Sequence, residues 1–391
     1  MKNLLLLFLS ICIFSVLSCF TFCNTLNYAQ AVESEEIENQ LSEATKNQLE
    51  LLELSEFENL YDEYSQSDKS LKDRVKDVVD GKESFSVASI VEVFLQNVKG
   101  TIKNTIHTIF LLLVLSLISG LISNFSSNSS SIKNILNVVF VCLTASVLIF
   151  SSTTALTETI ATIKAVGNFT KIVFPVLIVL VSATGAKASS TMYQPLVATL
   201  ATSIITVFCG VVISIVTLLL VLTILNNLVK DVKLDKLIAF LSSLTKWIIG
   251  LSFGIFFSYT SFAGIMTASK DGISIKTAKY AIKSYVPIVG GYLSDGFEIF
   301  RAGSIVLKNS VGVVGLILLV SIILMPAIKL LVTNLLLKFT SGLVELSGEK
   351  TISNLLVDIS KVFNFLLATI LTVFMMCFII ILLIVMTANL V

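Results

Sequence analysis

Residues 362–387 read VFNFLLATILTVFMMCFIIILLIVMT, a long apolar run without one charged side chain. An α-helix rises about 1.5 Å per residue and the hydrocarbon core of a bilayer is about 30 Å thick, so about 20 apolar residues are enough to cross it. Comparable runs recur along the chain. The predicted spans are Thr105–Ser123, Ile135–Ser152, Ser203–Leu225, Trp247–Thr267, Val311–Leu331 and Val362–Thr387.

The composition supports a membrane protein. Of the 391 residues, 55% are apolar and 14% are charged, and the mean hydropathy is +0.93. Soluble domains are about 45–50% apolar and about 25% charged, so a soluble core could not hide this excess. We therefore expect an all-α, polytopic helical membrane protein with six to seven spans, and not a soluble enzyme.

The N-terminus has the layout of a secretory leader. Lys2 is followed by the apolar stretch Leu4–Phe22, and then Ala29-Gln30-Ala31 fits the small-x-small cleavage pattern. Cleavage after Ala31 is our expectation. A retained signal anchor remains an alternative, and so does lipidation of Cys19, because Val16-Leu17-Ser18-Cys19 loosely resembles a lipobox. All three place the residues from 32 onward outside the cytoplasm.

The charge divides the chain after this leader. Residues 32–104 hold 17 acidic and 8 basic side chains, whereas residues 105–391 hold 9 acidic and 18 basic ones. Apolar residues recur at roughly helical spacing in the first region but are too few for a core of their own. We predict a signal peptide (1–31), a small acidic helical extracytoplasmic region (32–104) and a transmembrane domain (105–391).

Two further apolar segments look too short or too broken to be plain spans. Ile172–Gly185 contains Pro175, and Val286–Lys308 contains Pro287 and several glycines and charges. Each follows a span and a lysine-bearing stretch. This pairing points either to the centre of a transporter-like protein or to two interfacial helices with coincidental prolines. If both segments are re-entrant, loops 124–134, 226–246 and 332–361 are cytoplasmic. If both span, other loops of similar lysine content take that side, so charge does not decide. Re-entrant segments are our expectation.

The sequence carries few groups suited to catalysis. We find no phosphate-binding loop, nucleophile elbow or zinc motif, and the six cysteines lie in the leader or in apolar runs. His107, the single histidine, begins a predicted span. No enzyme activity and no cofactor or metal are therefore expected. The strongest candidate cluster is Asp295, Glu298 and Arg301, whose spacing places them near one face of a helix where Glu298 and Arg301 could pair.

One stretch resembles a known family. Pro287-Ile-Val-Gly-Gly-Tyr-Leu-Ser-Asp-Gly296 and Leu307-Lys-Asn-Ser-Val-Gly-Val-Val-Gly-Leu316 look like the signature region of the stage III sporulation protein AE family. The leader, the acidic helical region and the polytopic body agree with that family. The matching signature positions, of unknown role, are Pro287, Gly290, Gly291, Ser294, Asp295, Lys308, Asn309, Gly312 and Gly315.

The resemblance implies a role that the residues alone do not. Members of this family belong to a mother-cell membrane complex of endospore-forming bacteria, described as a channel or secretion-like assembly. The chain would be its permease-like, multi-pass subunit in the mother-cell membrane around the forespore. Implied partners are other stage III sporulation membrane proteins and a forespore membrane partner. The paired broken segments alone suggest an alternative, an independent secondary transporter or exporter.

Overall fold

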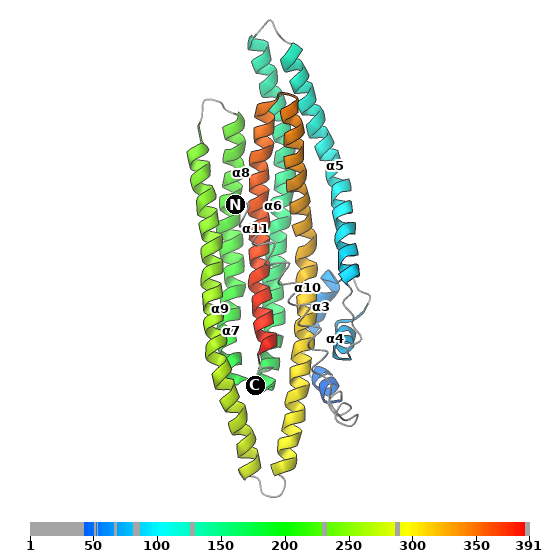
Figure 1. The fold of residues 1–391 in the computed structure, drawn as a ribbon, viewed down its shortest axis with the longest axis vertical. Coiled ribbons are helices and arrows are strands. Elements are labelled where there is room, and N and C mark those ends of the chain that lie inside the picture. The colour runs from blue at the N-terminus through cyan, green and yellow to red at the C-terminus, as the bar shows by residue number, and fades with distance from the viewer. Residues whose placement is uncertain are drawn as a thin grey trace.

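The structure is a computed structural model that describes residues 43–50, 52, 54–65, 69–80, 87–125, 130–228, 233–285 and 290–387. Pro287 and the expected leader, with Ala29 and Ala31, lie outside the described residues, as do the side chains of 290–295. Six long helical rods make up the body (Figure 1). Their bounds are α5 (Val87–Phe125), α6 (Ser130–Ala183), α7 (Lys187–Ser203) continuing through η1 (Ile204–Val212) into α8 (Ile213–Leu228), α9 (Asp235–Tyr285), α10 (Gly290–Leu346) and α11 (Lys350–Met386).

All six rods are long and apolar enough to cross a membrane. This confirms the all-α polytopic fold. Each predicted span lies on a rod of its own, although several rods extend well beyond the predicted bounds. The α6 helix has 54 residues and α10 has 57, so each is more than twice as long as the bilayer requires.

The prediction of a short re-entrant segment at 172–185 is wrong. Residues 172–183 are the last turns of α6, and the helix passes through Pro175 without interruption. Proline is tolerated here because Pro175 is exposed on the helix surface, where neighbouring groups can satisfy the carbonyl that it leaves free. Residues 290–308 are likewise not a separate short segment, since they form the first turns of α10.

The arrangement of the helix ends nevertheless agrees with the loop grouping expected for re-entrant segments. Three pairs of helix ends lie at the upper end of Figure 1, those of α5 and α6, α8 and α9, and α10 and α11. The α6–α7 turn and the facing ends of α9 and α10 lie at the lower end. The described helix ends within 124–134, 226–246 and 332–361 therefore share one side of the bundle.

Two tight turns are made possible by glycine. Gly185, between α6 and α7, and Gly348, between α10 and α11, have φ values of 87° and 88°. This left-handed conformation is strained for residues with a Cβ, and glycine commonly takes it just after a helix. Both hairpins can therefore close within a few residues.

The core is centred on α11, which packs against α10, α6, α8 and α9 and is buried on nearly all sides. Apolar side chains dominate the packing, but polar pairs join α10 to α11. Asn334 Nδ2 donates to Asn364 Oδ1 at 2.6 Å, and the hydroxyls of Ser341 and Ser353 lie 3.0 Å apart. In an apolar surrounding such pairs hold helices together and fix their register.

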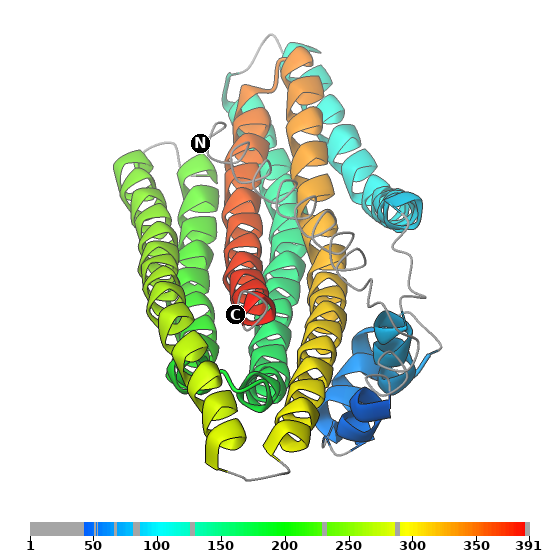
Figure 2. The ribbon, with the colours of Figure 1, turned by 60° about the horizontal axis from the view of Figure 1, so that its bottom comes forward.

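The N-terminal helices lie against the lower part of α10 (Figure 2). They comprise residues 43–50, α3 (Ser55–Tyr64) and α4 (Leu71–Val79). Gln48 joins them to α10 twice, because its Nε2 donates to the Phe300 carbonyl and its Oε1 accepts from Ser304 Oγ, both at 3.1 Å. Phe57, Tyr61 and Val75 are buried in the same core as the long helices. The apolar side chains of this region are therefore buried against α10 and not in a core of their own, as its low apolar content suggests.

The six-rod arrangement predicts the sides of three exposed lysines. Lys233 and Lys350 lie at the upper helix ends and Lys187 lies at the α6–α7 turn. In a chain without native cysteines, Lys233→Cys and Lys350→Cys should react with an impermeant maleimide under the same condition, either in intact cells or only after lysis. Lys187→Cys should show the opposite behaviour. Identical behaviour of all three would contradict an odd number of crossings between them.

Candidate functional site

Arg301 of α10 binds the end of α6. The side chain is half-buried, and its Nε donates to the carbonyl oxygen of Thr184 at 3.2 Å. The last carbonyls of a helix have no partner within the helix and carry partial negative charge. A guanidinium group at this position therefore satisfies an acceptor and complements the dipole of α6.

Lys308 likewise binds the last carbonyl groups of α11. It lies two turns beyond Arg301 on α10 and is completely buried. Its Nζ donates to the carbonyl oxygens of Val385, at 2.9 Å, and Thr387. The hydroxyl of Thr387 in turn lies 3.1 Å from that of Tyr193 on α7. A buried ammonium group requires such acceptors, because leaving it unpaired in an apolar surrounding is costly.

Asp271 of α9 places a negative charge at the N-terminus of α7. The residue is 1% exposed, and its carboxylate accepts from the backbone N–H groups of Ala188, at 2.9 Å, and Ser189, at 3.2 Å. The Ser189 hydroxyl also donates to it at 2.5 Å. The residue at the N-cap position of α7, Ala186, has no side chain to do this. Asp271 therefore caps α7 from a different helix.

Together these three side chains form a charged layer near the α6–α7 turn, defined here as Asp271, Arg301 and Lys308. Each binds a helix terminus of the sign that its charge favours. The layer links five helices within about two helical turns of α10. Arg301 and Lys308 come from α10, Asp271 comes from α9, and their partners lie on α6, α7 and α11. The contacts described above are with backbone and hydroxyl groups, and they hold these helix ends in position relative to one another.

Two signature glycines allow α10 to come close enough for this. A Cβ on Gly312 would lie 2.3 Å from Val385 Cγ2, and a Cβ on Gly315 would lie 3.3 Å from Val173 Cγ1. Small residues at such crossings let helix backbones approach. Gly312 thus lets α10 approach Val385, whose carbonyl accepts from Lys308. This is a physical reason for Lys308 and Gly312 to occur together in the signature.

The predicted cluster is only partly described. Arg301 belongs to the charged layer, Glu298 is an exposed residue one turn away, and the side chain of Asp295 lies outside the described residues. The pairing of Glu298 with Arg301 stays a prediction. Asn309 is half-buried beside Lys308, and the backbones of Gly290, Gly291 and Ser294 lie in the first turns of α10.

Asp271 was missed by sequence reasoning. In the sequence it is a lone acidic residue just beyond the span predicted at Trp247–Thr267, a position typical of an ordinary interfacial charge. Nothing local reveals that its acceptor oxygens meet a helix start more than 80 residues away in the chain.

A cavity of about 240 Å³ lies far from this layer, between the upper parts of α8, α9 and α11. Polar groups at its wall already bind one another. Asn226 Nδ2 donates to Asp235 at 3.0 Å, and Lys361 Nζ donates to Asp358 at 2.7 Å. Within the described part of the chain, no group of three His, Cys, Asp or Glu side chains is placed to hold a metal ion.

Replacing Asp271 tests the cross-helix cap. Asp271→Ala should lower the stability of the bundle by about 0.5–2 kcal/mol, the usual effect of removing an N-cap side chain. Asp271→Asn should lose much less, because asparagine caps helices about as well as aspartate. Thermal unfolding of the detergent-purified protein measures both, with the exposed Glu345→Ala as a control. Equal losses for the alanine and asparagine variants would show that Asp271 does not act as a cap.

Replacing Gly312 tests the close approach of α10 to α11. Gly312→Ala should destabilise the protein by about 1–3 kcal/mol, the usual range for overpacking a filled core. Gly342→Ala is the matched control on the same helix, because no heavy atom lies within 4 Å of the Cβ that it would add. That control should be neutral or slightly stabilising. The same unfolding measurement applies, and a Gly312→Ala protein as stable as the parent would mean that the two helices are not in this contact.

Comparison with known proteins identifies the family. A family model described as stage III sporulation protein AE matches residues 69–388. Stage III sporulation protein AE of Bacillus subtilis (strain 168) is 25% identical over 228 residues, which are 58% of this chain and 57% of that protein. The chain thus aligns with little more than half of this relative's length. No solved structure gives a significant match. Since the family model covers α4 to α11 and all of the charged layer, the chain belongs to the stage III sporulation protein AE family.

Proposed function

We propose that this sporulation protein is the permease-like membrane subunit of the channel or secretion-like complex between mother cell and forespore. The observation that carries the proposal is the family match over 69–388, which includes the entire transmembrane bundle. Six rods able to cross a membrane suit such a subunit. The role in the complex is non-enzymatic, and the charged layer serves to hold the helices rather than to react.

The side of the N-terminal helices follows from the leader. A secretory leader delivers the residues that follow it across the membrane, so residues 32–104 would lie in the space between the two membranes. The lower end of the bundle in Figure 1 would share that side, because α3 and α4 pack against the lower part of α10. The upper helix ends would then be cytoplasmic. Their lysines do not add to this assignment, because Lys187, Lys276, Lys279 and Lys283 lie toward the lower ends.

This placement suggests which part of the chain would contact each proposed partner. The N-terminal helices would be the part that meets a forespore membrane partner, and the other stage III sporulation membrane proteins would bind within or beside the mother-cell membrane. The alternative, an independent secondary transporter, was based on two broken helices. It loses that support because α6 runs unbroken through Pro175.

Compartment-specific complementation tests the proposal. In a strain lacking this gene, vegetative growth should be normal and sporulation should stop after engulfment. A copy expressed only in the mother cell should restore sporulation, whereas a copy expressed only in the forespore should not. Heat-resistant spore counts provide the measurement, and immunoblots confirm that both copies are made. Rescue by the forespore copy alone, or normal sporulation without the gene, would refute the proposed role.

A further inference from the structure

The outer surface of the lower half of α6 is polar. Exposed positions recur there at helical spacing and form one continuous stripe. Its members are Thr154, Thr157, Ala161, Lys164, Asn168, Lys171 and Pro175. The neighbouring α7 exposes mainly Thr191, Gln194, Thr199 and Thr202. Between residues 151 and 210, all of which the structure describes, Val179 is the one large apolar side chain that is exposed.

The two stripes lie side by side. A Cβ on Gly167 of α6 would lie 3.0 Å from Ile205, at the start of η1 just above α7, and α6 packs along α7. Asn168 and Lys171 are therefore close in height to Thr199 and Thr202. We call this combined surface the α6–α7 face.

At the same height, α9 presents the opposite chemistry. Most of its exposed side chains between residues 251 and 266 are large and apolar, and Ser258 and Ser261 are the polar exceptions. The large apolar ones are Leu251, Ile255, Phe257, Tyr259, Phe262, Ile265 and Met266. A helix surface of this kind is typical of contact with lipid.

Contacts with α11 establish that the heights agree. Thr170 Oγ1 of α6 lies 3.4 Å from Cys377 Sγ, and a Cβ on Gly264 of α9 would lie 3.4 Å from Leu383. Cys377 and Leu383 are six residues apart, which is about 9 Å along α11. Since α6 and α9 run in the same direction, residues 164–171 of α6 lie level with residues 252–259 of α9.

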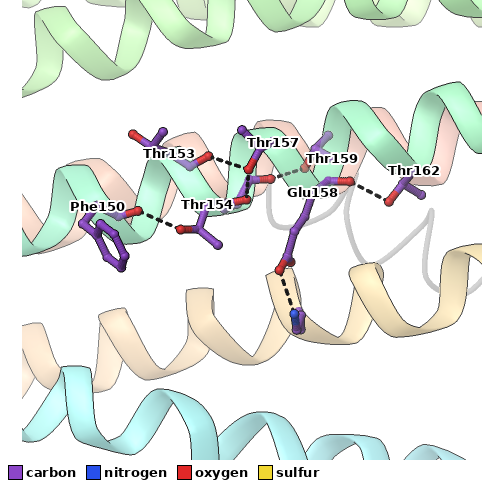
Figure 3. A network of polar contacts seen from close by, with 9 residues as sticks. Phe150, Thr153, Thr154, Thr157, Glu158, Thr159 and Thr162 are labelled. Atoms are coloured by element: carbon purple, nitrogen blue, oxygen red, sulfur yellow. Dashed lines mark hydrogen bonds and ion pairs between the residues drawn. The ribbon is translucent and has the colours of Figure 1, made fainter.

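The upper part of the α6 stripe is neutral and internally satisfied (Figure 3). Thr154 and Thr157 donate their hydroxyls to carbonyls of their own helix, at 3.1 Å and 2.9 Å. Glu158 Oε1 lies 2.7 Å from Lys329 Nζ of α10, and both side chains are 39% exposed. Glu158 is the one acidic residue in the sequences of α6 and α7, so Lys164, Lys171 and Lys187 give the remainder of the face a positive charge.

We infer that the α6–α7 face borders water at a height where α9 borders lipid, and that its lysines favour anionic over cationic solutes beside it. Charged side chains at membrane depth face water or protein rather than lipid, and lysine-lined aqueous surfaces select for anions. The face would have this property whether or not the chain works in a sporulation complex.

Charged thiol reagents test both parts of the inference. The parent is the full chain with its native cysteines replaced, in membranes opened by freeze–thaw so that reagents reach both sides. Asn168→Cys, which lies between the two lysines, is compared with Ile255→Cys at the same height on α9. Each variant is treated with an anionic or a cationic methanethiosulfonate, and the remaining thiol is counted after denaturation. Rates are divided by those of a free thiol with the same reagent.

We expect Asn168→Cys to react with both reagents, and with the anionic one about tenfold faster, in the range of local charge effects on association. Ile255→Cys should resist both. Adding Lys164→Gln and Lys171→Gln to the Asn168→Cys chain should abolish the anionic advantage. These positions are exposed, so their replacement leaves the core intact, and size-exclusion profiles in detergent check this.

Three results would overturn the inference. Resistance of Asn168→Cys to both reagents would place the face against lipid or protein. Equal reactivity of Ile255→Cys would place this whole layer outside the hydrocarbon. A cationic preference, or an anionic preference that survives removal of both lysines, would exclude the lysines as the source of selectivity.

Discussion

The need to satisfy helix ends inside an apolar bundle governs this fold. The first N–H groups of α7 and the last carbonyls of α6 and α11 have no partner within their own helices, and a buried group of this kind left unsatisfied costs several kcal/mol. Arg301, Lys308 and Asp271 meet the need from other helices. Because each cap comes from a different rod than the terminus it binds, the helices cannot slide past one another without losing a charged contact.

The helices are much longer than a bilayer is thick, and their surfaces are not uniform. At 57 residues, α10 is about 85 Å long, against about 30 Å of hydrocarbon. Exposed apolar side chains on α5, α9 and the upper part of α10 suit lipid. Lys164 and Lys171 on α6 do not, since a lysine at the bilayer centre costs about 2.5–3.5 kcal/mol on insertion scales. The long bundle therefore has one apolar surface, on α5, α9 and the upper part of α10, and one polar surface, on α6.

Hydropathy predicted the rods because a spanning helix needs little besides an apolar run of sufficient length. It misjudged their continuity. Pro175 looked like a break, yet its position on an exposed surface lets α6 continue, and exposure depends on tertiary packing that a single sequence does not reveal. Arg301 could be selected as a rare charge near an apolar segment. Lys308 was noticed only through the family resemblance, and Asp271 not at all, because their acceptors and donors lie 77 to 83 residues away.

The position of α11 in the chain has a consequence for the order of assembly. This helix is the most enclosed of the six, yet it follows every helix that it packs between. At about 5–20 residues per second, translation from the end of α10 to the end of α11 takes about 2–8 s. During that interval Asn334 and Lys308 are without the partners that α11 provides. The earlier rods must therefore remain loosely associated, and the bundle closes in one late step when its central helix arrives.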